Sequence, residues 1–406
     1  MRRTPIFTLI LACTIALVYD VNGQCIESPP GSGRYVGLDG GPCANAIPTA
    51  VPFLRITPDA RSGAMGDAGV AISPDANSMH INTSKLAFVD NDFALSATYS
   101  PWLRSLGLQD VYLAYLAGYK RINDLQTLGF SLRYFSLGDI QFTDENGQPI
   151  GNGRPNEFEL AAGFSQKLGE NFSVGVNGKF IYSNLASGQQ VGGIEINPGV
   201  AGAVDLSLYY RLPLDASQLT FGLALSNLGS KISYTKVTND YLPANFGLGA
   251  AWEFQLDDYN TLTVTSDVNK LMVPTPQHNL EDVDPQNGIP DYREQSLFKS
   301  IITSWSDAPE GFSEELREFT YSVGVEYWYD QQFALRAGFF NENILKGARQ
   351  YLTLGLGLKY NVFGINMSYL ISTGGNTALS SNPLDKTLRF SLLFDFSAVD
   401  NTTPPN

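Results

Sequence analysis

Apolar and polar residues alternate one by one through long stretches of the chain after residue 91. Between Leu388 and Phe396 apolar residues occupy every second position, with Arg389 and Ser391 among the residues between them. The same alternation recurs in the runs 246–254 and 352–360. Because successive side chains of a strand point to opposite faces, this pattern predicts β-strands with one apolar face and one polar or small face.

Such runs predict about fourteen strands, each near the 9–11 residues that a tilted membrane strand requires. They begin near residues 92, 109, 125, 155, 171, 199, 217, 241, 259, 319, 331, 349, 364 and 386. Short connections, such as 121–124 and 255–258, alternate with long ones, of which 271–318 is the longest. This is typical of outer-membrane barrels, in which an even strand count puts both ends on the periplasmic side and the long loops outside.

A soluble all-β protein, such as a sandwich, would also show alternation, with its apolar face inside. Here the second faces are too polar or too small for a dry core, and aromatic residues gather near the strand ends, as in membrane-interface girdles. These aromatic residues are Tyr99, Trp102, Tyr119, Tyr134, Tyr182, Tyr209, Tyr210, Trp328, Tyr329 and Tyr360. We therefore predict an all-β fold, a transmembrane outer-membrane β-barrel of about fourteen antiparallel strands over residues 91–398.

The start of the chain reads as an export signal. Arg2 and Arg3 precede an apolar run from about Ile6 to Val18, which is shorter than a spanning helix needs and suits a signal peptide. We predict a signal peptide at 1–23, with a Pro- and Gly-rich arm after it. The other predicted segments are the arm at 24–52, a hatch at 53–90 and a C-terminal tail at 399–406.

The cysteines indicate one covalent link in this arm. Cys13 would leave with the signal peptide, so that Cys25 and Cys43 form an even count in an oxidising compartment. We predict a disulfide between them, and two unpaired thiols are the alternative.

The segment 53–90 differs sharply from the strands that follow it, because it is rich in Gly, Ala, Asp and Ser. Small residues allow a backbone to pack in a confined space, and its charges could be satisfied in a polar barrel interior but not against lipid. We predict that it is a hatch, or plug, inside the barrel. Its candidate residues are Arg55, Asp59, Arg61, Gly63, Gly66, Asp67, Gly69, Asn82 and Lys85.

The hatch also carries a family resemblance. The run PDARSGAMGDAGVAISPDAN at 58–77, with Asn82 and the pair Leu86-Ala87, resembles the hatch of the FadL-like outer-membrane family and is most similar to its PorV branch. Where the wider family reads Asn-Pro-Ala-Gly-Leu, this chain has Lys85 in place of the glycine. The departure weighs against the alternative function, a FadL-like channel for long-chain fatty acids or other hydrophobic solutes.

The resemblance implies a function and a set of partners. It implies a type IX secretion component that binds exported cargo through the C-terminal sorting domain and passes it to the surface attachment machinery. The implied partners are the type IX translocon, cargo sorting domains, the attachment sortase complex and the lipid and lipopolysaccharide membrane.

Composition argues against two other classes of function. The net charge of −14 repels phosphate backbones, so that no nucleic-acid partner is expected. The chain has two histidines, His80 and His278, and although His80 and Ser84 are four residues apart, no third orienting group and no Gly-x-Ser-x-Gly motif accompany them. We expect no enzyme and no cofactor.

One acidic stretch, 281–291, is similar to calcium-binding loops. Asp282, Asp284, Asn287 and Asp291 supply oxygens, but one additional residue separates the second ligand from Asn287. Calcium needs 6–8 oxygens, several of which would have to come from backbone or water. The loop could therefore bind Ca²⁺, and a solvated acidic loop is the favoured alternative.

Two apolar patches are candidates for partner binding in loops that should face outward. In 296–305 apolar residues recur at helical spacing, and the loop 101–108 contains a second group. Exposed apolar patches usually mark a partner or a ligand entrance, whereas packing on the barrel rim is the alternative. The candidates are Trp102, Leu103, Leu106, Leu297, Ile301, Ile302 and Trp305.

Overall fold

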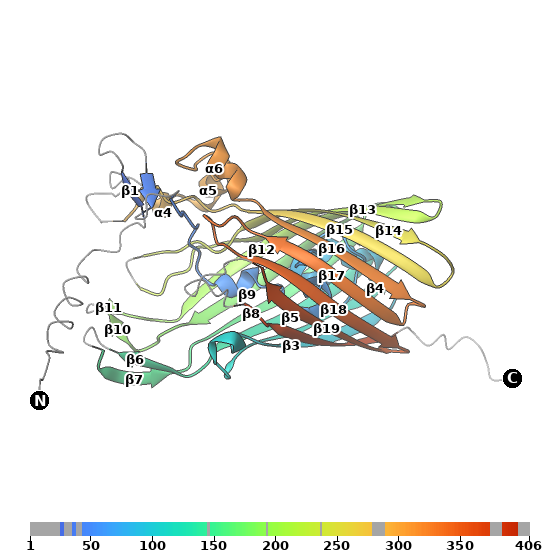
Figure 1. Ribbon diagram of the computed structural model, residues 1–406, viewed down its shortest axis with the longest axis horizontal. Helices are drawn as coiled ribbons and strands as arrows, with labels where there is room; N and C mark the ends of the chain where they lie inside the picture. Colours follow the sequence, from blue (N-terminus) through green and yellow to red (C-terminus); the bar gives the residue numbers. More distant parts are fainter. Residues whose placement is uncertain are drawn as a thin grey trace, which may run out of the picture.

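The computed structural model describes residues 25–27, 35–37, 43–143, 147–191, 194–235, 238–277, 289–373 and 384–396 (Figure 1). Within this part, fourteen antiparallel strands close a barrel in which β9 pairs with β12 and β20 pairs with β3. The barrel strands are β3 (Phe93–Pro101), β4 (Val111–Asn123), β5 (Gln126–Leu137), β8 (Asn156–Lys167), β9 (Phe172–Asn184), β12 (Gly199–Leu214), β13 (Ser217–Gly229), β14 (Asn245–Gln255), β15 (Asn260–Leu271), β16 (Thr320–Tyr329), β17 (Phe333–Asn341), β18 (Gln350–Tyr360), β19 (Phe363–Ser372) and β20 (Leu388–Phe396).

Shorter elements surround the barrel or fill it. The small strands form three hairpins, β1 (Cys25–Glu27) with β2 (Tyr35–Gly37), β6 (Ile140–Thr143) with β7 (Pro149–Gly153), and β10 (Gln190–Val191) with β11 (Ile194–Glu195). The helical elements are the 3-10 helices η1 (Pro52–Arg55), η2 (Thr83–Phe88) and η3 (Arg104–Leu106), and the α-helices α2 (Ala60–Gly63), α3 (Ser78–Ile81), α4 (Asp291–Glu294), α5 (Leu297–Thr303) and α6 (Phe312–Arg317). Within the described ranges, no helix is long and apolar enough to span a membrane.

The strand count and order predicted from the alternation are confirmed. The apolar face is the outer one: Leu354 is 52% exposed, whereas its neighbour Thr353 is 1% exposed and points into the lumen. The polar faces are buried because the lumen is filled by the chain itself, which explains why these faces looked wrong for a dry sandwich core.

Aromatic side chains lie on the outer face near both ends of the strands, but Tyr119 (3% exposed) and Tyr209 (1% exposed), which were predicted to join them, face the lumen instead. Tyr112 lies between Tyr99 and Tyr134, with ring centroids 5.5 and 6.1 Å away, at the end that carries the long loops. At the short-turn end Tyr259 faces Tyr329 with centroids 6.4 Å apart. Amphipathic rings at two levels are what the two water–membrane interfaces favour.

The N-terminal arm lies at the long-loop end of the barrel. The even strand count had predicted both ends of the chain at the opposite end, where the short turns are. The backbone amide of Asn45 donates to Leu345 in the β17–β18 loop (2.8 Å), and that of Ala50 donates to Tyr241 before β14 (2.9 Å). The chain then runs through the lumen and leaves at the opposite end, where β3 begins at Phe93. The predicted signal peptide and C-terminal tail lie outside the described residues.

Candidate functional site

The segment predicted as a hatch lies in the barrel lumen, and glycines on the inner wall let it approach closely. A Cβ added to Gly324 would lie 2.5 Å from the Met65 side chain, and one added to Gly222 would lie 2.3 Å from the carbonyl oxygen of Val70. The wall glycines whose added Cβ would meet hatch atoms within 3 Å are Gly129, Gly163, Gly175, Gly222, Gly249, Gly324, Gly338 and Gly355. They occur on eight different strands, so the wall is shaped to the hatch around most of its circumference.

The glycines of the hatch itself are also closely surrounded, by wall residues or by other hatch residues. Gly66 has φ +68°, a left-handed conformation that favours glycine, and an added Cβ would lie 2.6 Å from the backbone oxygen of Phe339. At Gly63 the added atom would meet the guanidinium of Arg389 at 2.7 Å, and at Gly69 it would meet the Ile81 side chain at 2.4 Å.

A buried ion-pair triad connects the hatch to the wall. Arg61 binds Glu326 of β16 through two hydrogen bonds, Nη2 to Oε1 at 2.7 Å and Nε to Oε2 at 2.9 Å. Arg336 of β17 donates from Nε to the same carboxylate at 2.6 Å. All three side chains are at most 8% exposed. Because each charge has a partner of the opposite sign, the triad can persist where water is largely excluded.

Wall side chains also satisfy the irregular backbone of the hatch. Asp267 Oδ2 accepts from the amides of Gly69 (2.6 Å) and Val70 (2.9 Å). Thr353 accepts from the Gly66 amide at 2.9 Å and donates to the Ala64 carbonyl at 2.8 Å. A non-helical backbone at membrane depth is stable only when such partners are present.

The remaining hatch candidates hold the segment together or attach it to the wall. Lys85 is 2% exposed, and its Nζ donates to the carbonyl of Gly69 at 2.7 Å. Asp59 caps α2 by accepting from the Ser62 amide at 2.8 Å. The other contacts are Asn82 with the carbonyls of Val70 and Leu208, Arg55 with Glu342 at 3.2 Å, and Asp67 with Tyr351 and Arg389.

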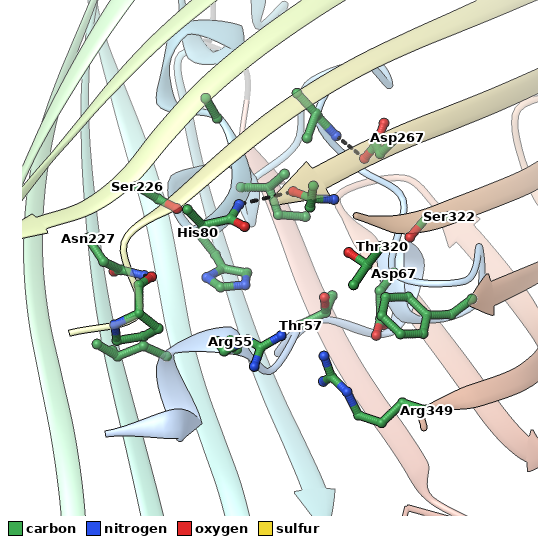
Figure 2. A pocket seen from close by; sticks show the side chains of 18 residues that line it. Arg55, Thr57, Asp67, His80, Ser226, Asn227, Asp267, Thr320, Ser322 and Arg349 are labelled. Atoms are coloured by element: carbon green, nitrogen blue, oxygen red, sulfur yellow. Dashed lines mark hydrogen bonds between the residues drawn. The ribbon is translucent and has the colours of Figure 1, made fainter. Parts of the chain in front are cut away.

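Among the described residues, two cavities of the lumen lie on opposite sides of the hatch. The one on the long-loop side measures about 120 Å³, and Figure 2 shows Arg55, Asp67, His80, Asp267 and Arg349 among the side chains around it. The one near the short turns measures about 430 Å³ and includes the Arg61–Glu326–Arg336 triad in its lining. Both are lined largely by polar and charged groups, so neither is an apolar ligand pocket of the usual kind.

The apolar part of the lumen is filled by the chain's own side chains. Phe53 of the hatch stacks on Phe135 of β5 with ring centroids 6.4 Å apart, and Trp102 meets Phe135 edge-on at 6.3 Å. Trp102 is 5% exposed, so the prediction that it belongs to an outward patch was wrong. It folds inward because an apolar surface on the inner wall and hatch was available to it, which sequence spacing could not indicate. In the same loop Leu103 is half-buried and Leu106 is exposed.

A second buried ion network connects strand β15, two loops and the arm at the long-loop rim. Lys270 contacts Glu315 (3.0 Å) and Glu318, whereas Lys346 contacts Glu318 (2.9 Å) and Glu314. Asn45 of the arm donates to Glu314 at 3.0 Å. The rim around α6 is therefore a fixed structure in which buried charges are paired.

The second predicted patch divides into two faces. Ile301 packs at the edge of a buried cluster that includes Tyr241 and Met272, and Leu297 is half-buried. Trp305 meets Phe246 edge-on with centroids 5.3 Å apart. Ile302 instead remains 73% exposed.

The two remaining sets of candidates are only partly described. Cys43 is buried and disulfide-bonded, but the side chain of Cys25 is not among those described, so the pairing stays a prediction. Asp282, Asp284 and Asn287 lie outside the described residues, and Asp291 is the exposed first residue of α4. Elsewhere in the described part, no group of three or more acidic, His or Cys side chains could hold a metal ion.

The wall partners of the hatch are functional residues that the sequence analysis missed. Glu326, Asp267 and the wall glycines each occupy an inward position of an alternating strand, so a signal was present. A buried carboxylate at such a position requires a partner, but alternation alone does not tell which segment supplies it.

A closed barrel with a tightly fitted hatch defines the class of protein, a plugged outer-membrane β-barrel of FadL-like architecture. The toluene transporter TbuX of Ralstonia pickettii has 12% sequence identity and a TM-score of 0.50, covering 83% of this chain and 98% of that one. A Pseudomonas aeruginosa FadL homologue has 13% identity and a TM-score of 0.42, covering 87% and 100%. The toluene transporter TodX of P. putida has 12% identity and a TM-score of 0.47, covering 83% and 98%. A search of curated proteins gave no match.

Residues 42–278 match the family model described as type IX secretion system protein PorV. The matched region exceeds half of the chain. The chain belongs to the PorV family of type IX secretion system proteins, and it is located in the outer membrane. Family and fold are those of secretion and transport barrels, not those of enzymes.

Proposed function

We propose that this barrel is a carrier for type IX cargo in the outer membrane. It would bind exported cargo through the C-terminal sorting domain, receive it from the translocon and deliver it to the surface attachment sortase complex. The observation that carries the proposal is the combination of a lumen occupied by the hatch with a long-loop rim held by buried ion pairs. A protein that passes its cargo along the cell surface needs an ordered outer surface and no open pore.

The contents of the lumen support this function over a hydrophobic-solute channel. Such a channel needs an apolar pocket near the hatch. Here the apolar region is occupied by Phe53, Trp102 and Phe135, and the two cavities are polar. The hatch would have to break the Arg61–Glu326 pair to move aside.

The proposed partner surface is the long-loop end of the barrel. Leu106 in the β3–β4 loop and Ile344 in the β17–β18 loop are 52% and 74% exposed, and neither is needed to close the lumen. Buried apolar anchors at protein interfaces commonly cost upwards of about 2 kcal/mol when they are truncated.

The test is made in the native host. Deletion of the gene should leave type IX cargo in the periplasm, and the wild-type chain should restore secretion. A Leu106→Asp, Ile344→Asp variant should fold as a heat-modifiable barrel but recover less translocon and cargo in a pull-down. Uptake of toluene or long-chain fatty acids should not change on deletion. Normal secretion after deletion, together with lost solute uptake, would overturn the proposal in favour of a channel.

A further inference from the structure

The helix α5 lies against the outside of the barrel, at its long-loop end. In β14 the buried residues Gly247, Gly249 and Ala251 face the lumen, so Phe246 and Leu248 face outward. Trp305, which follows α5, packs edge-on against Phe246 with centroids 5.3 Å apart. The helix therefore covers the surface that faces lipid further down the same strand, where Leu248 is 49% exposed.

The outward position of α5 is supported by the neighbouring strands. Lys270 of β15 pairs with Phe246 and hence shares its face, whereas Asn269 lines the luminal cavity. The Lys270 ammonium lies 5.9 Å from the ring centroid of Trp305 and 5.6 Å from that of Phe319. Lys270 is nevertheless 1% exposed, because the segment containing α5 and α6 covers it. In Figure 1 these two helices project beyond the barrel wall beside β14–β16.

Both helices turn apolar side chains away from the barrel. On α5, Phe298 is 79% and Ile302 is 73% exposed, and they are four residues apart on one face. On α6, Phe312 and Leu316 repeat this spacing and are 76% and 49% exposed. Exposed apolar groups on two adjacent helices are not expected at a surface that is only in contact with water.

The position of this face identifies what covers it. Phe246 is the second residue of β14, just as Tyr112, in the aromatic cluster with Tyr99, is the second residue of β4. The apolar face of α5 thus continues the outer aromatic girdle, which is the level of the lipid headgroups. Short helices with aromatic and aliphatic residues on one face lie in that layer with this face buried in the upper acyl region.

We propose that α5 and α6 form a lipid anchor, which inserts Phe298, Ile302, Phe312 and Leu316 into the outer leaflet beside the barrel. The ion network of Lys270 with Glu315 and Glu318 holds the anchor to the rim. The anchor is independent of the secretion function, because its occupant is the lipid surface and not a protein.

The test uses the full-length protein in phosphatidylcholine vesicles that contain acyl chains spin-labelled near the headgroup. Ile302→Cys is labelled with an environment-sensitive fluorophore without reductant, and the unsubstituted chain gives the background of the native cysteines. Ser187→Cys is the control, since Ser187 is also exposed but lies in the β9–β12 connection, away from α5. Leu248→Cys reports full lipid exposure.

Quenching by the spin-labelled lipid should be at least about twofold stronger at residue 302 than at residue 187, and should approach the value at residue 248. Equal and weak quenching at 302 and 187 would overturn the proposal and would leave a protein partner as the occupant. Neither result depends on translocon or cargo, so the test is separate from that of the secretion function.

Discussion

Gly338 of β17 and Gly66 of the hatch meet without any side chain between them. A Cβ added to Gly338 would lie 2.1 Å from the Gly66 backbone nitrogen, which is far inside contact distance. The hatch and wall therefore touch through their main chains at this position. Such close approach has a direct consequence for any larger residue at either site.

Gly338→Leu is predicted to prevent the hatch from seating, because the wall and the hatch are both backbone at this contact. Overpacking a well-packed interior typically costs about 1–3 kcal/mol, and a backbone clash should reach the upper part of that range. The variant should show less heat-modifiable folded barrel or a larger single-channel conductance. Gly202→Leu is the control, because the nearest atom to its added Cβ is 3.9 Å away. Wild-type folding and conductance of Gly338→Leu would show that the hatch does not pack here.

Glu326→Gln is predicted to destabilise the barrel strongly, since it leaves Arg61 and Arg336 buried without their shared counter-charge. Removing one partner of a buried ion pair commonly costs about 3–5 kcal/mol. The urea midpoint of unfolding in detergent should fall, and the pore should open more often in planar bilayers. Asp139→Asn is the matched control, because Asp139 pairs with Arg154 at an exposed site, with side chains 61% and 83% exposed. Similar effects of the two substitutions would contradict an anchoring role for Glu326.

The segment around α5 and α6 is predicted to be held more tightly as the pH falls. Burial raises the pKa of Asp307 from 3.8 to about 6, and Glu315 and Glu318 add to the effect. A carboxyl whose pKa is raised on folding binds more protons in the folded state, so stability increases as the pH falls through about 6 toward 4.

Asp307→Asn should therefore slow hydrogen exchange in 297–317 at about pH 7.5 and reduce its change between about pH 7.5 and 5, after correction for intrinsic exchange rates. The Thr275 amide, which donates to Asp307 at 3.2 Å, can still donate to the asparagine oxygen. Glu310→Gln in the same segment should change exchange little, because it pairs with Arg317 at a partly exposed site. Faster exchange in Asp307→Asn than in the wild type would refute the view that the buried charge of Asp307 destabilises this segment.

The long loops are predicted to face the cell exterior. A cysteine at Ser187, in the β9–β12 connection, should react with a membrane-impermeant maleimide on intact cells, whereas one at Asp257, in the β14–β15 turn, should react only after permeabilisation. Both positions are exposed in the folded barrel, so accessibility depends on the side of the membrane alone. Equal labelling on intact cells would reverse or abolish the proposed orientation.

Cys43 is predicted to be oxidised in the mature protein through a bond to Cys25. The mass of the purified, unreduced chain should be two hydrogens below that of the reduced chain. A peptide map should recover both cysteines in one cross-linked fragment. Reaction of both thiols with maleimide without reductant would exclude the bond.

The sequence by itself determined the barrel. Period-two alternation fixed which residues face lipid, as at Leu354 and Thr353, and the turn and loop lengths fixed the order of fourteen strands. These features depend only on residues that are close together in the sequence, so they can be predicted from each segment separately. The small and charged composition of 53–90 likewise required a confined, polar surrounding.

Only the tertiary structure decided which side chains contact each other across the lumen. Arg61 and Glu326 are 265 residues apart in sequence, and nothing in the sequence around either residue identifies the other as its partner. The sequence allowed Trp102 to lie either on the outer surface or against the inner wall. In the structure it packs against Phe135 on the inner wall. The two faces of α5 could be told apart only after the wall beneath it was known. Such contacts depend on barrel closure, which positions residues from distant strands and is encoded in no single segment.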